Sequence, residues 1–411
     1  MADRRRVVIT GIGPVTPVGT GVEDFWTGLT SGRNGVRTIT QFDTSELPVT
    51  VAGEVDFETE RFLDAKEARR TDRYSHFAIA AGSLAWEDAG TPEVVSERGG
   101  VIFATGIGGI TTLLRQHLVL LDKGPGRVSP FMVPMLMANA AAGHLAMRYG
   151  LTGHNMATLS ACASSNHAIG EGMRLIRDGY LDLAIVGGSE AATHPLTVAA
   201  FAQMTALTKN PDPDTASRPF DAERSGFVLS EGGAAMILES EEHATARGAR
   251  IYAEVAGYGA SDDAYHITAP DPKGSGATLA IRGALRDAGV APADVDYINA
   301  HGTSTPLNDA AETVAIKAAL GEDTARQVAI SSTKSMTGHM LGAAAAVEGA
   351  ACVLAITRGR IPPTVHYATP DPDCDLDITP NVARDLEVTL ALSNSFGFGG
   401  QNACVAFRAY G

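Results

Sequence analysis

A cysteine set among small residues is the first group in this chain that could act as a nucleophile. Cys162 lies in the run 158–170 (Thr-Leu-Ser-Ala-Cys-Ala-Ser-Ser-Asn-His-Ala-Ile-Gly), where we expect an extended segment to turn into a helix. Amide N–H groups at the start of a helix favour a thiolate and can bind a developing oxyanion. Free cysteines are also among the most buried residue types, so this run alone leaves a structural cysteine equally open.

Two histidines stand in segments that could face a cleft. His301 follows an expected strand and opens the small polar turn 301–309, and His339 closes the run 331–339 (Ser-Ser-Thr-Lys-Ser-Met-Thr-Gly-His). Imidazole changes its charge near neutral pH and can donate or accept a proton. A hydrogen-bonded structural role remains open for each histidine on its own segment.

A lysine and a glutamate flank His339. Lys334 precedes it, and Glu348 lies further along the alanine-rich helix that we expect to follow. A solvated lysine needs no backing of Gly and Ala, so the pattern favours a partly buried ionic and hydrogen-bonded network around Lys334. Glu348 is equally compatible with an exposed position on the helix.

The glycine-dense segment 394–402 (Asn-Ser-Phe-Gly-Phe-Gly-Gly-Gln-Asn) lies near the end of the chain. Its glycines permit positive φ and a close approach of backbone N–H groups to a ligand. It lacks the Lys-Ser/Thr ending of a nucleotide-binding loop. The glycines of 11–13 and 106–109 also fail the dinucleotide fingerprint, because Thr16 and Thr111 replace its last glycine. The sequence therefore argues against an NAD cofactor, and a tight turn between strands is the simpler interpretation of 394–402.

Composition bounds the class of protein. The 411 residues are 45% hydrophobic and 19% charged, which is typical of a folded globular chain. A net charge of −15 with no long basic stretch gives no support for nucleic-acid binding. We expect no membrane span, because no segment reaches ~20 apolar residues and the most apolar one, 343–356, contains Glu348.

The cysteines and the start of the chain indicate a compartment. The basic start leads within a few residues into an expected strand, so we predict no export signal. The cysteines lie far apart without CxxC spacing, so we expect reduced thiols in the cytoplasm and no zinc site; they are Cys162, Cys352, Cys374 and Cys404.

Short apolar runs alternate with helical patterns, which predicts a mainly parallel α/β core. Apolar periodicity predicts helices over 73–89 and 166–178. A similar strand-and-turn element opens the chain and recurs at 297–302, which suggests two related halves meeting near Arg250. The expected strands are 6–10, 100–104, 183–187, 234–238, 297–300, 328–331 and 404–408.

Taken together, these motifs resemble the β-ketoacyl-acyl carrier protein synthases, and in particular their type II elongating members. The resemblance covers nearly the whole chain and rests on several spaced motifs in one order. They are Ser-Ala-Cys at 160–162, Asn-Ala-His-Gly-Thr-Ser-Thr at 299–305, Ser-Ser-Thr-Lys-Ser-Met-Thr-Gly-His at 331–339, and Asn-Ser-Phe-Gly-Phe-Gly-Gly at 394–400.

The resemblance implies an α/β fold of the thiolase-like type, with five α/β/α/β/α layers and two pseudo-duplicated halves. We expect residues 1–250 to form the half with the nucleophile, and residues 251–411 the half with the histidines and the lysine. Members of this family work as dimers. The methionine-rich segment 130–137 is expected near the dimer contact and the acyl tunnel, although it would also suit plain core.

The resemblance also implies a reaction, a decarboxylative Claisen condensation. Cys162 would carry the acyl group as a thioester, with the backbone N–H groups of Cys162 and Phe398 as the oxyanion hole. His301 and His339 would stabilise the enolate left when malonyl carrier protein loses CO2. Lys334, held by Glu348, would act by position and charge.

Further positions match the family's substrate and partner contacts. Substrates would arrive on the phosphopantetheine of an acyl carrier protein, with no tightly bound cofactor and no metal. Thr303 and Thr305 would bind the pantetheine arm, Phe398 would gate the site, and Ile107 and Phe201 would line the acyl pocket. Thr205 replaces a basic residue that the family often has. The expected carrier-docking residues are Lys66, Arg69, Arg70 and Arg127.

Three alternatives remain open beside the fatty-acid enzyme. A type II polyketide ketosynthase subunit, paired with a chain-length-factor partner rather than an identical one, would carry the same Cys-His-His set. A non-catalytic partner subunit that only shapes a tunnel would not need Cys162 and both histidines. A thiolase would use a second cysteine in a Cys-x-Gly turn, whereas Cys404 is followed by Val405.

Overall fold

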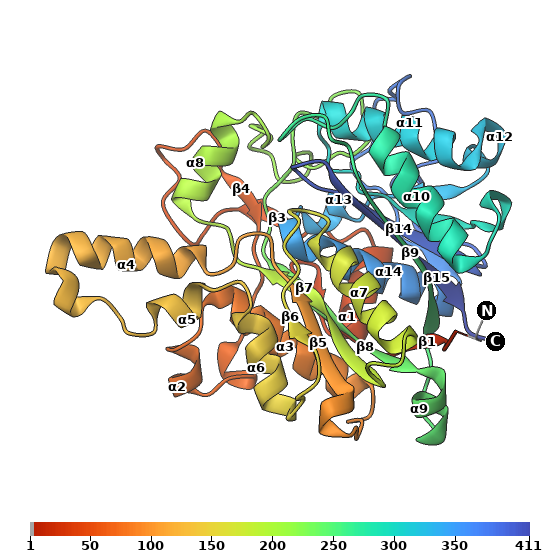
Figure 1. Ribbon diagram of the computed structural model, residues 1–411. Coiled ribbons are helices and arrows are strands. Elements are labelled where there is room, and N and C mark those ends of the chain that lie inside the picture. Colours follow the sequence, from red (N-terminus) through yellow and green to blue (C-terminus); the bar gives the residue numbers. More distant parts are fainter. Residues whose placement is uncertain (1–3) are drawn as a thin grey trace.

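The computed structural model describes residues 4–411 and shows a layered α/β molecule with one projecting arm (Figure 1). The strands are β1 (Val7–Thr16), β2 (Gly19–Thr20), β3 (Val36–Thr38), β4 (Val51–Gly53), β5 (Gly99–Ala104), β6 (Asn155–Met156), β7 (Leu183–Glu190), β8 (Gly232–Ser240), β9 (Ala253–Asp262), β10 (Tyr297–Asn299), β11 (Ala329–Ser331), β12 (Arg360–Ile361), β13 (Arg384–Asp385), β14 (Leu390–Phe396) and β15 (Gln401–Ala409). The α-helices are α1 (Val22–Thr30), α2 (Ala65–Ala68), α3 (Arg73–Asp88), α4 (Ile110–Lys123), α5 (Met132–Leu136), α6 (Ala140–Tyr149), α7 (Ser164–Arg177), α8 (Pro195–Gln203), α9 (Glu241–Ala246), α10 (Ser275–Ala288), α11 (Pro306–Leu320), α12 (Glu322–Ala325), α13 (Lys334–Thr337) and α14 (Ala344–Arg358). Short 3-10 helices are η1 (Thr59–Arg61), η2 (Ser96–Arg98), η3 (Pro125–Arg127), η4 (Pro292–Asp294) and η5 (Leu341–Ala343).

The main sheet consists of two halves with the same internal pattern. Its order is β11-β10-β14-β15-β9-β1-β8-β7-β5-β6. In one half, β1, β8 and β7 pair antiparallel, and β7, β5 and β6 pair parallel. In the other half, β9, β15 and β14 pair antiparallel, and β14, β10 and β11 pair parallel. The halves join where β1 pairs with β9. The repeat suspected from the sequence is therefore present in the topology.

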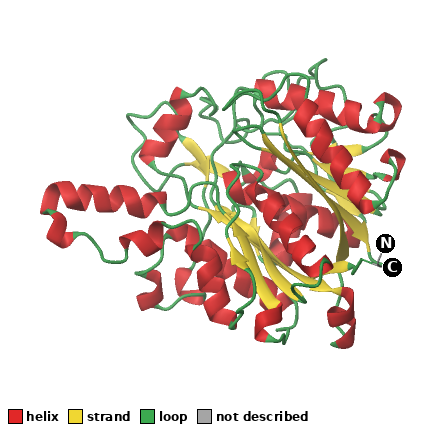
Figure 2. Ribbon diagram, in the orientation of Figure 1, coloured by secondary structure: helices red, strands yellow, loops and turns green. Residues whose placement is uncertain are grey.

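Helices form the other three layers. α7 and α14 pack against each other and against strands of both halves, while α3 and α6 cover one outer face and α10 covers the other. Figure 2 shows helices between the two groups of strands as well as outside them. This α/β/α/β/α order is the fold class that the family resemblance predicted.

α14 is a core helix of unusually apolar composition. With η5 it spans Leu341–Arg358, which is long and apolar enough to cross a membrane, but 83% of that stretch is buried inside the protein. Burial on all sides explains why its sequence shows no polar face. Glu348 and Cys352 lie in its buried interior.

The predicted elements mostly exist, but one prediction about the sheet was wrong. The seven predicted strands correspond to β1, β5, β7, β8, β10, β11 and β15, and the two helices to α3 and α7. The sheet is mixed rather than mainly parallel, because the strands nearest the junction are antiparallel. The hydrophobic runs resembled those of parallel strands because helices cover both faces of the antiparallel strands as well.

The arm formed by α4, η3 and α5 projects from the body (Figure 1). Thr112 is the buried residue of α4, whereas Leu118 and Leu121 are 64% and 70% exposed. Segment 130–137 continues this surface, with Val133 59% exposed. The segment is therefore not plain core within one chain.

Candidate active site

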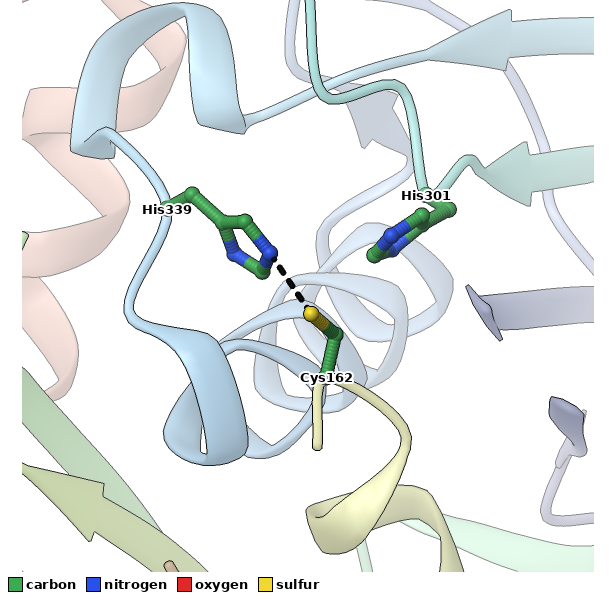
Figure 3. A group of neighbouring side chains, drawn as sticks. All are labelled: Cys162, His301 and His339. Carbon is green, nitrogen blue, oxygen red and sulfur yellow. Dashed lines mark hydrogen bonds between the residues drawn. The ribbon is translucent and has the colours of Figure 1, made fainter. Parts of the chain in front are cut away.

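Three side chains that are distant in the sequence meet in one buried centre (Figure 3). The ligand-forming atoms of Cys162, His301 and His339 all lie within 4.8 Å of one another. His339 Nε2 is 3.0 Å from Cys162 Sγ, and the two imidazole rings have centroids 5.4 Å apart. One sulfur and two imidazoles can therefore act on a single bound thioester.

Each of these residues comes from a loop at the end of a core element. Cys162 lies two residues before the first residue of α7, His301 follows β10, and His339 lies between α13 and η5. The backbone beside them is strained, with positive φ at Ala161 (48°) and Leu341 (47°). Such angles persist only where the surrounding structure fixes them, and they cluster at functional sites.

Lys334 fixes the state of His301. Its ammonium is almost fully buried, donates to the His301 carbonyl oxygen at 2.6 Å, and pairs with Glu348. Its Nζ also lies 3.4 Å from His301 Nδ1. An ammonium has only donors, so Nδ1 must accept and the neutral ring carries its proton on Nε2.

Both histidines are neutral in this site. Burial lowers the pKa of His301 well below 6.5, and the nearby Lys334 and His339 lower it further. Burial and the Lys334 charge lower the pKa of His339 in the same way. Neutral imidazoles can donate one hydrogen bond each, which suits them to polarise a carbonyl rather than to carry charge.

The nucleophile is a buried thiol with one backbone donor aimed at it. Burial raises the pKa of Cys162 to about 12, whereas the Lys334 charge and the hydrogen bond from the Phe398 backbone N–H lower it. The start of α7 also favours the thiolate. Burial outweighs these favourable groups, so the Cys162 pKa lies above that of a free thiol, contrary to the simple expectation of a thiolate.

The glycine-dense segment turns tightly between β14 and β15 and backs onto the nucleophile. A Cβ at Gly397 would lie 2.7 Å from the Ser160 carbonyl oxygen and 3.3 Å from the Cys162 nitrogen. Only glycine permits this approach, which places the backbone N–H groups of Cys162 and Phe398 near the same sulfur.

A cavity of about 390 Å³ opens onto this centre. Its wall includes all five residues predicted to contact substrate, and Thr303 and Thr305 have their hydroxyl oxygens 2.9 Å apart. The described lining residues include no lysine or arginine, and the only carboxylate among them is Asp263. The predicted lining residues are Ile107, Phe201, Thr303, Thr305 and Phe398.

The predicted docking residues are all exposed but do not form one cluster. Lys66 lies in α2, Arg69 and Arg70 directly follow it, and Arg70 lies over the Phe131 ring at 4.6 Å. Arg127 lies in η3, which follows α4 at the tip of the arm (Figure 1). Within residues 4–411 none of the four forms an ion pair, so their charges are available to a partner.

Sequence reasoning missed two carboxylates that hold the His301 loop. Glu312 accepts from the backbone N–H groups of His301 and Gly302 at 2.8 and 2.7 Å, and Asp309 accepts from Thr303 N at 3.0 Å. Burial raises the pKa of Glu312 to about 7. The signal was present as acidic residues in the helix that directly follows the loop, where they can reach back to its amides.

The same triad has the spacing of a metal site, but its protonation opposes that use. Cys162, His301 and His339 each offer one ligand atom. A metal facing the cavity would need an unprotonated Nε2 on His301, which would turn Nδ1–H toward the Lys334 ammonium. The donor set therefore does not fit a resident metal ion.

Solved structures define the class of protein. A ketosynthase with its chain length factor, from the ishigamide system, matches with a TM-score of 0.93 and 40% identity over 100% of both chains. A type II polyketide ketosynthase, bound to its acyl carrier protein, matches with a TM-score of 0.92 and 37% identity over 99% of this chain and 100% of that one. The protein is a thiolase-like ketosynthase, a condensing enzyme of the acyltransferase class.

Sequence comparisons give the family. The beta-ketoacyl synthase N-terminal domain matches residues 4–244 and the C-terminal domain residues 252–368, so the chain belongs to the beta-ketoacyl synthase family. It is 52% identical to 3-oxoacyl-[acyl-carrier-protein] synthase 2 of Synechocystis sp. over 99% of both chains. It is 47% identical to the Staphylococcus aureus protein of the same name over 100% of both chains.

Proposed function

We propose that this enzyme is a 3-oxoacyl-acyl carrier protein synthase of fatty acid biosynthesis, which extends an acyl chain held on Cys162 with malonyl carrier protein. The observation that carries the proposal is the convergence of Cys162, His301 and His339 around one cavity, with Lys334 fixing the His301 proton on Nε2. Full-length identity of 52% and 47% to enzymes of that name supports this substrate class.

The first half-reaction loads the enzyme. Cys162 Sγ attacks the thioester carbonyl of the acyl carrier, and the thiol proton is taken up by the departing pantetheine sulfur, while His339 Nε2–H, 3.0 Å from Sγ, donates toward the reacting sulfur. The Cys162 and Phe398 N–H groups bind the transient oxyanion. A thioester bond to Cys162 forms as the one to pantetheine breaks, so no net charge is created.

The second half-reaction makes the carbon–carbon bond. The Nε2–H groups of His301 and His339 donate to the malonyl thioester carbonyl, which stabilises the enolate formed as the C–CO2 bond breaks. That carbanion attacks the acyl thioester on Cys162, and the sulfur leaves as a thiolate, which takes up one proton from solvent. The products are CO2, the free Cys162 thiol and the 3-oxoacyl carrier protein.

Neutral histidines suit this step because the substrate already carries the charge. The malonyl carboxylate is negative and becomes neutral CO2, while the negative charge moves onto the thioester oxygen. The fixed Lys334–Glu348 pair keeps a positive charge close to His301. The site therefore stabilises the migrated charge during decarboxylation itself, and a proton is needed only afterwards, for the Cys162 thiolate.

A loading and condensation assay tests the proposal. The protein is incubated with a panel of acyl carrier protein thioesters, the acyl groups on Cys162 are identified by mass spectrometry, and malonyl carrier protein is then added. We expect loading followed by release of the 3-oxoacyl carrier protein. Loading without condensation would contradict the roles given to the two histidines.

A polyketide ketosynthase subunit is the second candidate, favoured by the fold match to ketosynthases that work with a chain length factor or a polyketide carrier protein. The identities of 40% and 37% to those chains are lower than the 52% to the fatty-acid enzyme. Condensation by the purified chain alone would favour the fatty-acid assignment, and a strict need for a partner subunit would favour the polyketide one. Retention of the reactive triad argues against a purely tunnel-shaping subunit.

The assembly that goes with this function is a dimer in the cytoplasm, with an acyl carrier protein as transient partner. The exposed leucines of the α4 arm give an apolar surface for a second subunit. Arg70 lies over the ring of Phe131 of that arm, and Lys66 and Arg69 lie in and at the end of α2 just before it, so an acidic carrier protein would be held on this side. We assign the two structural repeats to residues 1–250 and 251–411, with the junction directly before β9.

A further inference from the structure

Glu190, the last residue of β7, is a buried carboxylate beside the active site. It accepts hydrogen bonds from Gly106 N at 2.6 Å, Thr105 Oγ1 at 3.1 Å and Gly342 N at 3.2 Å. Within residues 4–411 it has no cationic partner at ion-pair distance. Burial raises its pKa to about 7, and the hydrogen bonds from Gly106 and Thr105 oppose that shift.

The position is costly for stability alone. A buried carboxylate without a cation loses its hydration and recovers only part of it from backbone N–H groups. The backbone N–H groups of Gly106 and Gly342 can only donate, so the position requires an oxygen acceptor that reaches both segments. A buried carboxylate of this kind is therefore expected where it fixes backbone segments that a residue with a smaller desolvation cost could not hold in place.

The segments that Glu190 joins are two walls of the catalytic cavity. Gly106 and Ile107 line the cavity on one side, and Leu341 lies on the turn that follows His339 on the other. The two backbones are in direct contact, because a Cβ at Gly342 would lie 2.1 Å from Gly106 N. Ser165 of α7 also donates to the Gly342 carbonyl oxygen, which ties the same turn to the helix that follows Cys162.

We propose that Glu190 is a positioning residue of the condensation, which holds the acyl-pocket wall at Gly106–Ile107 against the turn after His339. Movement of this contact would change two things together: the width of the acyl pocket and the distance of His339 from the reacting thioester. This inference rests on the proposed function, because it assigns Glu190 to the acyl and malonyl steps of that reaction.

The test compares Glu190→Gln and Glu190→Ala with the unchanged enzyme. Loading of long and short acyl groups from carrier protein is measured at several concentrations, and malonyl decarboxylation is measured separately. We expect the ratio of the KM values for long and short acyl carriers to change by about tenfold. That factor corresponds to the free energy of one charge-assisted hydrogen bond. We also expect kcat for decarboxylation to fall, while the melting temperature of Glu190→Gln stays the same or rises because a buried unpaired charge is gone.

Glu239→Gln provides the matched control. Glu239 is equally buried but lies at the opposite end of the β7–β8 pair, opposite Leu183, and is held by Arg247 and His243. Its loss should lower stability without changing the loading ratio. The inference is overturned if both Glu190 variants keep the loading ratio and decarboxylation rate, or if their losses merely follow melting temperature as in the control. If the unchanged enzyme neither loads nor decarboxylates, it is the proposed function that fails.

Discussion

Replacement of Lys334 by methionine should separate its structural role from its chemical one. The substitution leaves Glu348 buried without its partner, which costs about 3–5 kcal/mol for a broken buried ion pair. For 411 residues the unfolding entropy is roughly 0.9 kcal/mol per kelvin, so the melting temperature should fall by about 3–6 °C. Burial already raises the pKa of Glu348, so the orphaned carboxyl will take up a proton and keep the loss near the lower end.

The double variant Lys334→Met/Glu348→Leu should recover most of that stability. An apolar pair of similar volume is often as stable as the buried ion pair it replaces. Malonyl decarboxylation should nevertheless stay low, by about 10²–10³-fold, because His301 loses both its fixed tautomer and the nearby positive charge. Release of CO2 and thermal unfolding are measured on the same preparations.

Lys317→Met is the control for loss of a paired lysine. Lys317 pairs with Asp375 and Glu322 at the surface end of α11, outside the cavity lining. It should change stability by less than about 1 kcal/mol and leave decarboxylation intact. Full decarboxylation by the double variant would refute the argument, because it would show that Lys334 acts on His301 only through the fold.

Four further predictions concern the site and its surroundings. Cys162→Gln should abolish acyl loading, detected by mass spectrometry, yet retain malonyl decarboxylation; loss of both would contradict the division of labour. His301→Asn should lower decarboxylation by about 10²-fold or more with loading retained, measured by single-turnover kinetics. Because the pKa values of His301 and His339 are depressed, their neutral forms persist as pH falls, so the imidazole NMR shifts of both histidines should be constant from pH ~8 down to ~6 and change only in more acid solution. Titration of either ring already near pH 6.5 would contradict this. Charge reversal of Arg69 and Arg70 should raise KM for carrier-bound acyl groups about tenfold and leave KM for a small pantetheine thioester unchanged.

The catalytic loops could be predicted from the sequence because their local chemistry is distinctive. Cys162 and His301 stand where an extended run or a strand ends among small residues, and the structure places both at such ends, whereas His339 lies among small residues between α13 and η5. Their mutual distances were beyond local reasoning, since those depend on how the two halves stack. Glu312 was missed because a carboxylate that caps a loop from the next helix looks, in sequence, like an ordinary helix residue.

The prediction of a mainly parallel sheet was wrong for a similar reason. A strand covered by helices on both faces is apolar along its whole length whether its neighbours run parallel or antiparallel to it. β8 and β7 are such strands, fully buried and antiparallel. The direction of such a strand can be inferred only from the segments that connect it to its neighbours. β9 and β14 were not predicted from the sequence, so the connections within the second half could not be followed.

The duplicated fold gives a physical reason for where the reaction takes place. α7 begins two residues after Cys162 and α14 begins shortly after His339, and each is the central helix of its own half. The starts of the two helices lie together, since Ser165 in the first turn of α7 bonds to Gly342 just before α14. Both positive helix ends therefore face the place where the thiolate, the oxyanion and the enolate develop negative charge. A single copy of the repeat would supply one such end and one side of the cavity, so the chemistry requires the junction of both.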